Sequence, residues 1–293
     1  MTTQGVLSVK TGSSHFDIVV LVLGVSFTMT RFPRPSRGDN MTAFSISRDN
    51  LNSFLSSFGK DLMDIAITVN RDSVHAAVAK STHYISRQVE CSDTTPGNLY
   101  ISDIPKVKAY LSTSKIPDLS FTQSGKTGTL HIRCGNTSLQ IPTTSYIESQ
   151  KKVGLMSKTI DNARDSMWRT WFDLPLTHHA RVSADSLKPA TGFKKVLGDK
   201  FACKTEFDID DESLIIRGGS TNTGKMFVKA DLSHVESSGV SVRSAFDKWL
   251  PELLTNLPAG EFELHTGDET VLILEQATSN FLMVVIDQEY EED

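Results

Sequence analysis

Few residues in this sequence have the types and spacing that a catalytic site needs. Residues 112–115 and 126–128 imitate two elements of β-lactamases, but the required Ser-Asp-Asn element is absent. His178 and His179 are neighbours in a strand-like run, so their side chains point to opposite faces and do not share a metal ion. Residues 208–212 contain acids that are explained more simply by a hairpin turn. Without a Gly-rich phosphate loop or a Cys/His cluster, the sequence predicts a non-enzyme with no metal site and no cofactor.

The residues with usable chemistry are bases that fall on or beside four predicted helices. Lysine and arginine on a helix face attract the phosphates of nucleic acids, whatever the base sequence. Lys188 and Lys195 are seven positions apart, which predicts that they lie two turns apart on one face. An ordinary solvated helix face is the alternative interpretation. The candidate DNA-binding residues are Arg48, Lys60, Lys106, Lys108, Lys188, Lys194, Lys195, Arg243 and Lys248.

The elements that carry these bases occur twice along the chain. A short amphipathic helix at residues 103–111 is followed by three strand-like runs that begin after Pro117. A second helix, expected from Ser244 to residue 254, is again followed by three runs, which begin after Pro258. A helix with three antiparallel strands, repeated at a spacing of more than about 100 residues, indicates two copies of one domain.

Each copy also begins with the same order of elements, a strand, a helix and a hairpin. Pro189 is tolerated only in a first helical turn, so the helix of the second copy is expected to have its cap at Ser186 or Asp185. The sequence thus predicts an α+β fold of two tandem domains, each with two helices packed on antiparallel sheets. The strand, helix and hairpin are expected at residues 44–47, 48–58 and 62–79 in the first copy and at 172–182, 183–197 and 201–218 in the second.

Residues 1–40 are expected to be an extension outside the fold. Their apolar run from Asp17 is shorter than the roughly 20 residues that a membrane helix needs, so no membrane partner is expected. The run also lacks the charged start and clean cleavage site of a signal peptide, which is the lesser alternative. Residues 146–169 are polar, without a clear core pattern, and are expected to connect the domains. The expected boundaries are 41–147 for domain 1, 148–170 for the connector, 171–287 for domain 2 and 288–293 for an acidic tail.

Composition and charge narrow the class of protein. A hydrophobic content of 39% and a charged content of 22% are typical of a soluble globular protein. The net charge of −5 includes five acids in residues 287–293, so the body of the chain is nearly neutral. Such a body favours bases that gather on one surface over a uniformly basic DNA-binding protein. The three cysteines have no metal-ligand spacing and predict buried, reduced thiols.

At this level of detail the chain resembles the DNA polymerase sliding clamps, and most closely the trimeric clamps of T-even-type bacteriophages within the family that includes proliferating cell nuclear antigen. Residues 99–111, Leu-Tyr-Ile-Ser-Asp-Ile-Pro-Lys-Val-Lys-Ala-Tyr-Leu, and the strands at 119–132 carry the resemblance. The clearest piece runs from Leu-Pro-Ala-Gly-Glu-Phe-Glu-Leu at 257–264 to Phe-Leu-Met-Val-Val-Ile-Asp at 281–287. The resemblance covers about residues 41–287 as an ordered pattern, while the extension and the long connector depart from the phage pattern.

The resemblance implies a topological function. A homotrimer, a ring of six similar domains, would encircle double-stranded DNA, with the helices lining the hole and their bases facing phosphates. The ring would tether a DNA polymerase and be loaded by a clamp loader, with no catalysis of its own. The implied location is the cytoplasm of an infected bacterial host. The family usually holds partner peptides in an apolar pocket, for which Met167, Trp168, Trp171 and Phe172 are candidates.

Three alternatives remain open from the residues. The aromatic cluster at 167–172 is explained equally well as the first strand of the second core. The whole chain could be a viral structural or assembly protein built from duplicated β-rich domains, whose helices need no inward bases. A hydrolase with a site assembled from distant residues, such as His178 or Asp210, is the third alternative.

Overall fold

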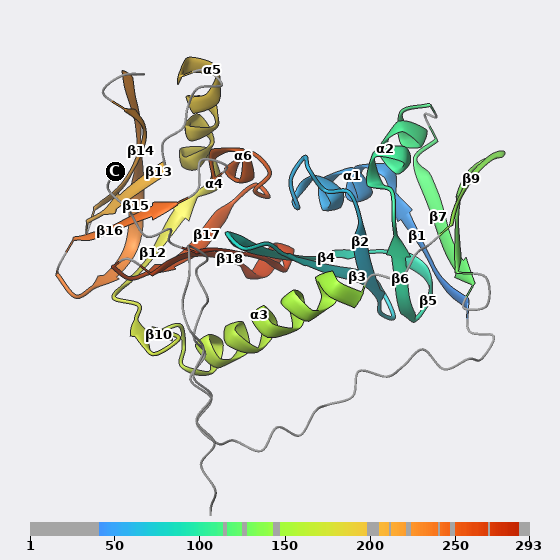
Figure 1. Cartoon of the computed structure of the whole chain (residues 1–293), viewed down its shortest axis with the longest axis horizontal. Helices are drawn as coiled ribbons and strands as arrows, with labels where there is room; N and C mark the ends of the chain where they lie inside the picture. Colours follow the sequence, from blue (N-terminus) through green and yellow to red (C-terminus); the bar gives the residue numbers. More distant parts are fainter. Residues whose placement is uncertain are drawn as a thin grey trace, which may run out of the picture. The chain divides into compact units, whose positions relative to one another are not determined.

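The computed structural model describes residues 41–113, 116–124, 128–142, 147–197, 205–210, 212–220, 224–239, 241–246, 250–268 and 270–286. All strand pairs in this part of the chain are antiparallel, and helices cover both faces of the longest sheet (Figure 1). The first half contains β1 (Met41–Ser47), α1 (Arg48–Ser56), β2 (Ile65–Val69), β3 (Ser73–Ala79), β4 (His83–Glu90), β5 (Ser92–Thr95), β6 (Gly97–Ile101), α2 (Ile104–Ser112), β7 (Asp118–Ser124), β8 (Thr129–Cys134) and β9 (Thr137–Pro142).

The second half repeats this order after a helical connection. The connection contains α3 (Ile147–Asp165), β10 (Thr170–Trp171) and β11 (Leu174–Pro175). The second half contains β12 (His178–Ser183), α4 (Ala184–Leu187), the 3-10 turn η1 (Lys188–Gly192), α5 (Phe193–Leu197), β13 (Thr205–Ile209), β14 (Ser213–Ser220), β15 (Gly224–Ser237), β16 (Val242–Phe246), α6 (Leu250–Leu254), β17 (Glu261–Thr266), β18 (Val271–Gln276), η2 (Ala277–Ser279) and β19 (Phe281–Ile286).

One strand pair joins the two halves. The last strand, β19, pairs with β4 of the first half, from Phe281 opposite Arg87 to Val285 opposite His83. This pair completes a sheet of twelve strands in the order β16-β13-β14-β15-β12-β17-β18-β19-β4-β3-β2-β6. A second sheet, β5-β1-β7-β8-β9, belongs to the first half alone. The chain therefore closes its own halves together through backbone hydrogen bonds.

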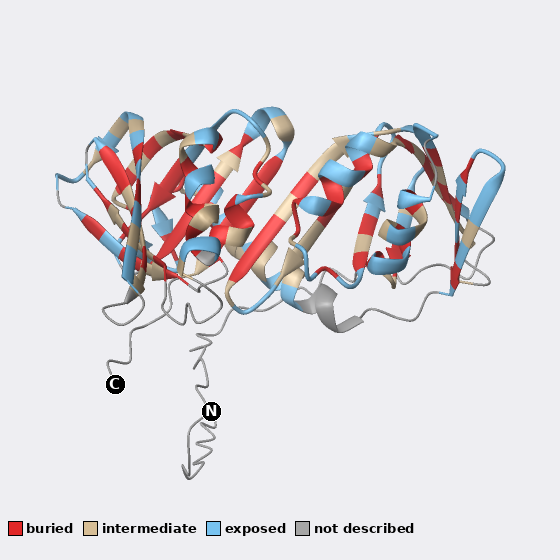
Figure 2. Cartoon of the chain, turned by 90° about the horizontal axis from the view of Figure 1, so that it is seen from above, coloured by how far each residue is buried: buried red, intermediate tan, exposed pale blue. Residues whose placement is uncertain are grey.

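The central strands β18 and β19 are buried on both faces. Leu272, Leu274 and Met283 belong to the large core under α1, α2 and α6, whereas Ile273 and Val284 belong to a second cluster under α3. Because alternate residues of a strand point to opposite faces, burial of both sets produces a continuous apolar run. Figure 2 shows this burial as red positions along the strands, with exposed positions on the outer sides of the helices.

The first two helices begin as the sequence predicts. The Ser47 hydroxyl accepts a hydrogen bond from the Asn50 amide at 3.2 Å and caps α1. The Asp103 carboxylate accepts one from the Lys106 amide at 2.8 Å and caps α2, whose first turn contains Pro105. The predicted helices at 48–58 and 103–111 and the hairpin of β2 and β3 are thereby confirmed.

The helix expected from Ser244 is wrong at its start. Residues 242–246 form β16, because Val242, Ser244 and Phe246 alternate inward and leave Arg243 exposed. The described helix spans Leu250–Leu254, with Pro251 near its start as Pro105 is in α2. Arg243 is therefore on a strand and not on a helix.

The helix expected at 183–197 is interrupted. Its cap is Ser183, whose hydroxyl accepts a hydrogen bond from the Asp185 amide at 3.2 Å, and not Ser186 or Asp185. Pro189 lies beyond the first turn of this helix, and the chain passes through η1 before α5 begins at Phe193. Proline lacks the amide hydrogen of an interior helical turn, which accounts for the break. The two-turn spacing argument for Lys188 and Lys195 does not hold.

The connector contains a helix that the sequence analysis missed. Ile160 and Ala163 of α3 are buried against the outer face of the junction, and Val153 and Met156 pack beside them. The spacing of these four residues is that of one helical stripe, so the signal was present within a mostly polar segment. The same region departs from the expected strand at 172–182, since β10 and β11 form a tight hairpin before β12.

We expect Ile160→Ala to lower the free energy of unfolding by about 2–4 kcal/mol, because it leaves a cavity between α3 and the junction strands. Urea unfolding followed by circular dichroism measures the change. Leu155→Ala is the matched control in the same helix, since Leu155 is 69% exposed and its truncation is expected to cost less than about 0.5 kcal/mol. Equal losses for the two variants would mean that α3 does not pack on the sheet.

Candidate nucleic-acid interface

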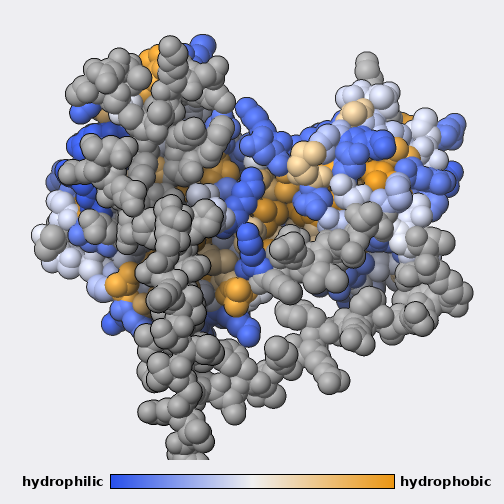
Figure 3. Space-filling model, in the orientation of Figure 1, coloured by the Kyte–Doolittle hydropathy of each residue, from blue (hydrophilic) through white to orange (hydrophobic). Residues whose placement is uncertain are grey.

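The helices other than α3 lie on one side of the long sheet. Leu51 of α1, Val107 of α2, Leu187 of α4, Phe193 of α5 and Leu254 of α6 all belong to the large core cluster. Their opposite sides face solvent, and Figure 3 shows a mostly hydrophilic surface over α1 and α2 at the upper right. One side of the sheet thus carries the helices of both halves, as a shared interface would require.

Helix α2 presents its bases directly. Lys106 is exposed, and its ammonium lies 4.0 Å from the Asp103 carboxylate, whereas Lys108 is half-buried. An exposed pair at this distance contributes little to stability, so the Lys106 ammonium remains available to an anion. Lys60 is also exposed, in the loop that follows α1.

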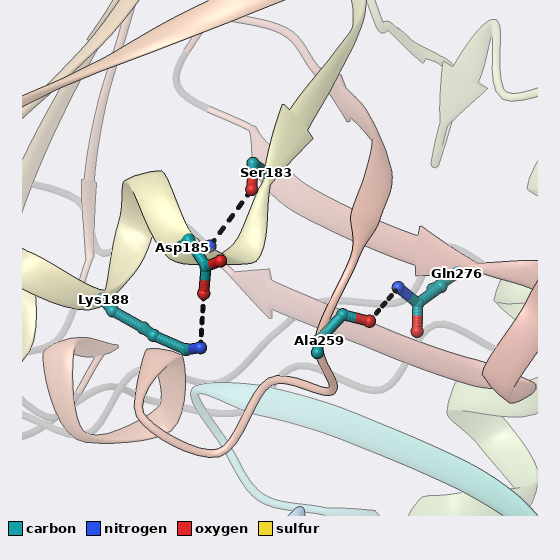
Figure 4. Close-up of polar contacts among 5 residues, drawn as sticks. All are labelled: Ser183, Asp185, Lys188, Ala259 and Gln276. Carbon is teal, nitrogen blue, oxygen red and sulfur yellow. Dashed lines mark hydrogen bonds and ion pairs between the residues drawn. The ribbon is translucent and has the colours of Figure 1, made fainter.

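The bases of the second half are less simple. The Lys188 ammonium lies 2.5 Å from the Asp185 carboxylate, next to the Ser183 cap (Figure 4). The same view shows the Gln276 side chain, whose amide donates to the Ala259 carbonyl at 3.0 Å and fixes the loop before β17. Lys195 is exposed on α5. The Lys194 side chain and Lys248 lie outside the described residues.

Two predicted DNA-binding residues are placed otherwise. The Arg48 guanidinium donates to the carbonyls of Leu111 and Ile116, so it ties α1 to the end of α2. Arg243, on β16, forms an ion pair with Asp208 of the neighbouring strand at 2.8 Å. Each guanidinium thus has a partner that is distant in sequence, and DNA binding by Arg48 and Arg243 stays a prediction.

A further base was missed because it lies in a turn. Lys80, at the end of the β3–β4 hairpin, lines a cavity of about 260 Å³ together with Lys60, Asp61 and Glu252. Glu252 of α6 occupies the position that Lys106 occupies in α2, in Leu-Pro-Glu-Leu and Ile-Pro-Lys-Val respectively. Acids are thus interspersed among the bases, which makes the helix side only mildly basic.

The candidate partner-binding residues separate into two pairs. Trp168 and Trp171 are buried in the cluster under α3, with exposed fractions of 8% and 4%. Met167 and Phe172 are exposed at 71% and 68%, and both have positive φ angles. The tryptophans are therefore part of a core, and only Met167 and Phe172 offer apolar surface to a partner.

A histidine pair lies beneath this segment. His179 of β12 and His265 of β17 are directly opposite in register, with their Nδ1 atoms 2.9 Å apart. The Trp168 ring stacks on His265 with centroids 5.3 Å apart, and its Nε1 donates to Glu275 at 2.9 Å. Burial, and to a smaller extent the charge of His179, lowers the pKa of His265 to about 4. Burial also lowers the pKa of His179, although Glu236 opposes this shift.

Two kinds of feature are absent from the described ranges. These ranges contain no group of three or more His, Cys, Asp or Glu side chains arranged to hold a metal ion. They also contain no helix with the length and apolarity to span a bilayer. Cys134 is buried and Cys91 is half-buried, while Cys203 lies outside the described residues. Residues 208–212 include a turn in which Asp210 accepts from the Ser213 amide at 2.6 Å, as the hairpin interpretation predicts.

Solved structures share this fold. The chain is similar to a protein described as a DNA polymerase III beta subunit from Eubacterium rectale, with a TM-score of 0.63 and 10% identity over 85% of this chain and 66% of that one. It is also similar to the PCNA of Thermococcus kodakaraensis, with a TM-score of 0.57 and 16% identity over 84% of this chain and 98% of that one. It is similar, too, to the A. fulgidus PCNA, solved with the C-terminal region of FEN-1. The TM-score is 0.62, and the identity is 12% over 86% of this chain and 100% of that one.

These likenesses confirm the predicted fold class: the chain has the DNA clamp fold. It spans 66% of the length of the beta subunit but nearly the whole length of either PCNA chain. No family model matches the sequence, and no curated protein matches it. Identities of 10–16% establish the fold alone.

The histidine pair predicts a dependence of stability on pH. Because the folded pKa of His265 is about 4 and the ordinary value is 6.5, the unfolded chain binds protons first as the pH falls. The free energy of unfolding should therefore fall between about pH 6.5 and pH 4, by up to about 3.4 kcal/mol from this residue. His75, whose pKa burial also lowers, adds to the fall.

Urea unfolding at pH 7.5, 5.5 and 4.5 tests this expectation. His265→Gln removes one titrating group and should flatten the fall, whereas His131→Gln, at an exposed position of β8, should leave it unchanged. An unchanged fall in the His265 variant would show that the pair does not control the pH response.

Proposed function

We propose that this chain is a sliding clamp, which encircles double-stranded DNA as a ring of several copies and tethers a DNA polymerase. The observation that carries the proposal is the β19–β4 junction, considered together with the internal repeat. The final strand of each half should pair with the same kind of strand, but among the described residues only β19 has such a partner within the chain. The ring would raise polymerase processivity by enclosure, without catalysis of its own.

The repeat identifies the two edges that would meet between copies. The counterpart of β19 is β9, which pairs with β8 alone in the described sheet. The counterpart of β4 is the first part of β15, because β15 pairs with β14 as β4 pairs with β3. Along residues 224–231 the other edge of β15 has no strand beside it, since β12 pairs only from Leu232 onward among the described residues. Unpaired edges are templates for strand addition.

The register follows from the same correspondence. Phe281 lies opposite Arg87 at the junction within the chain, and the equivalent pair between copies is Thr137 opposite Val228. This register places Leu139 opposite Met226, both of which are half-buried against the core of a single chain. Association would bury the remaining apolar surface of these two side chains.

The proposed number of copies is three. Two domains per chain and nearly full coverage of two PCNA chains support a homotrimer of six domains. The resemblance to clamps of T-even-type phages remains a prediction, and with it the phage origin and the cytoplasm of an infected bacterial host. A clamp loader would open the ring, and Met167 and Phe172 would contact polymerase or loader peptides.

The helix side would face the DNA. Lys60, Lys106, Lys188 and Lys195 are exposed on it, with the half-buried Lys108 and the newly found Lys80. Neighbouring acids weaken the attraction to phosphates, which suits a ring that must slide. Affinity would be low, independent of base sequence and sensitive to salt.

The strand register can be tested by cross-linking. Gln140→Cys combined with Lys225→Cys places thiols at positions that the register sets opposite, so mild oxidation should give covalent dimers and trimers on a non-reducing gel. The control, Gln140→Cys with Lys229→Cys, moves one thiol by about 13 Å along the strand and should not cross-link. Equal yields from both pairs would contradict the register, and a monomer at every concentration would contradict the ring.

The DNA-facing side can be tested by loading the protein on DNA. The ring should stay on closed circular DNA and slide off linear DNA. Lys106→Ala, Lys188→Ala and Lys195→Ala together should lower duplex affinity and reduce the slope of log affinity against log salt by about 1 per lost phosphate contact. Lys152→Ala, an exposed lysine of α3, is the matched control and should change neither. Equal retention on linear and circular DNA, or an equal effect of the control, would refute this assignment.

A further inference from the structure

A second basic surface lies on the face of the sheet away from α4 and α5, around an exposed aromatic ring. Phe227 of β15 is 72% exposed, more than any other large apolar side chain in the described part of the molecule. Its neighbours Val228 and Ala230 are buried, and Met226 packs against the large core. Phe227 therefore points outward because the strand alternates, and not because the segment lacks structure.

Cations surround this ring. Lys225 and Lys229 lie two positions away on either side along β15, on the same face, and both are exposed. Arg217 of β14 is directly opposite Phe227 in the strand register. These four residues, Lys225, Phe227, Lys229 and Arg217, are called the Phe227 surface below.

The acids of this face lie farther from the ring. Asp208 is on β13, one strand beyond β14, and both Arg217 and Arg243 form ion pairs with it. This one carboxylate is shared by two guanidinium groups. Glu206, directly opposite Arg217 on β13, is half-buried, and Asp210 interacts with the charge of Lys229. Asp231 lies four positions from Phe227 along β15. The positive charge is thus concentrated beside the phenyl ring.

We propose that the Phe227 surface binds single-stranded nucleic acid. A base would stack on the Phe227 ring, while Lys225, Lys229 and Arg217 would contact the flanking phosphates. An aromatic side chain among cations on an open antiparallel sheet is a recurring arrangement for unpaired bases, because every base has a face that can stack. Bases within a duplex are already stacked, so the double-stranded DNA of the proposed clamp would use the helix side instead.

The proposed contact between copies does not cover this ring. The register that pairs β9 with β15 sets Ser138 opposite Phe227, and serine is too small to cover a phenyl ring. In the corresponding pair within the chain, Ser86 takes the place of Phe227 and Leu282 takes the place of Ser138. There the apolar residue, Leu282, is buried under α3. Phe227 would therefore remain accessible in the ring as it is in one chain.

The test is binding of fluorescent oligo(dT), about 15 nucleotides long, to the full chain, measured by anisotropy at low and moderate salt. Phe227→Ala should weaken binding by about 5-fold to 100-fold, the loss expected for one stacked base. Phe227→Leu should lose nearly as much affinity, because leucine has no ring on which a base can stack, although it keeps the apolar bulk. Val196→Ala is the control, since Val196 is 66% exposed on the opposite, helical side.

Several outcomes would overturn the proposal. Undetectable oligo(dT) binding, or equal affinity of the Phe227→Ala variant and the unchanged protein, would do so directly. If Phe227→Ala changed the mass measured by light scattering and left the oligo(dT) affinity unchanged, Phe227 would belong to a contact between copies. Binding of a Glu/Tyr peptide more tightly than oligo(dT) would assign the surface to an acidic protein. The retention of Phe227→Ala on circular duplex DNA, measured in parallel, reports on the clamp function separately.

Discussion

The rest of the structure depends on the antiparallel pairing of β19 with β4. This pairing joins strands from opposite ends of the chain, and burial on both faces of β18 and β19 fixes it. Since alternate residues of these strands need cover on opposite sides, helices must lie on both faces of the sheet. One face takes the helices of the repeated domains and the other takes α3. The bases of α2 and α5 reach one side of the molecule because of this division, and not because of any local feature of those helices.

The sequence predicts elements well where one period dominates a segment. The helices at α1 and α2 have both a cap and a 3.6-residue stripe, and the strands from β7 to β9 and β17 to β19 have clear turns between apolar runs. It fails where two periods compete. Residues 242–246 satisfy a strand pattern, and the apolar residues that follow extended the apparent helix too far towards the N-terminus. In α3, many polar residues hid a stripe that buries only one narrow side.

The candidate site is less predictable than the fold because its charges have distant partners. Lys106 could be placed on an exposed helix face from local spacing alone. The partners of Arg48 and Arg243 could not be predicted, since the Ile116 carbonyl and Asp208 become their neighbours only in the folded chain. The pairing of His179 with His265 likewise exists only through the β12–β17 register. Sequence spacing identifies where bases occur, and tertiary contacts decide which of them remain free.

The two kinds of junction in the proposed ring differ in strength for a reason that lies in α3. Within the chain, Ile160, Ala163, Trp168 and Trp171 cover the outer face of the junction strands and add apolar burial to the strand pairing. Between copies, the same pairing would be made by β9, the counterpart of β19. The outer faces of β9 and β15 carry the polar residues Ser138, Gln140 and Lys225. At the same positions, the β19–β4 junction within the chain carries Leu282, Val284 and Tyr84. Separation of two copies would therefore expose much less apolar surface than opening the chain itself, so a ring of this construction would open between copies.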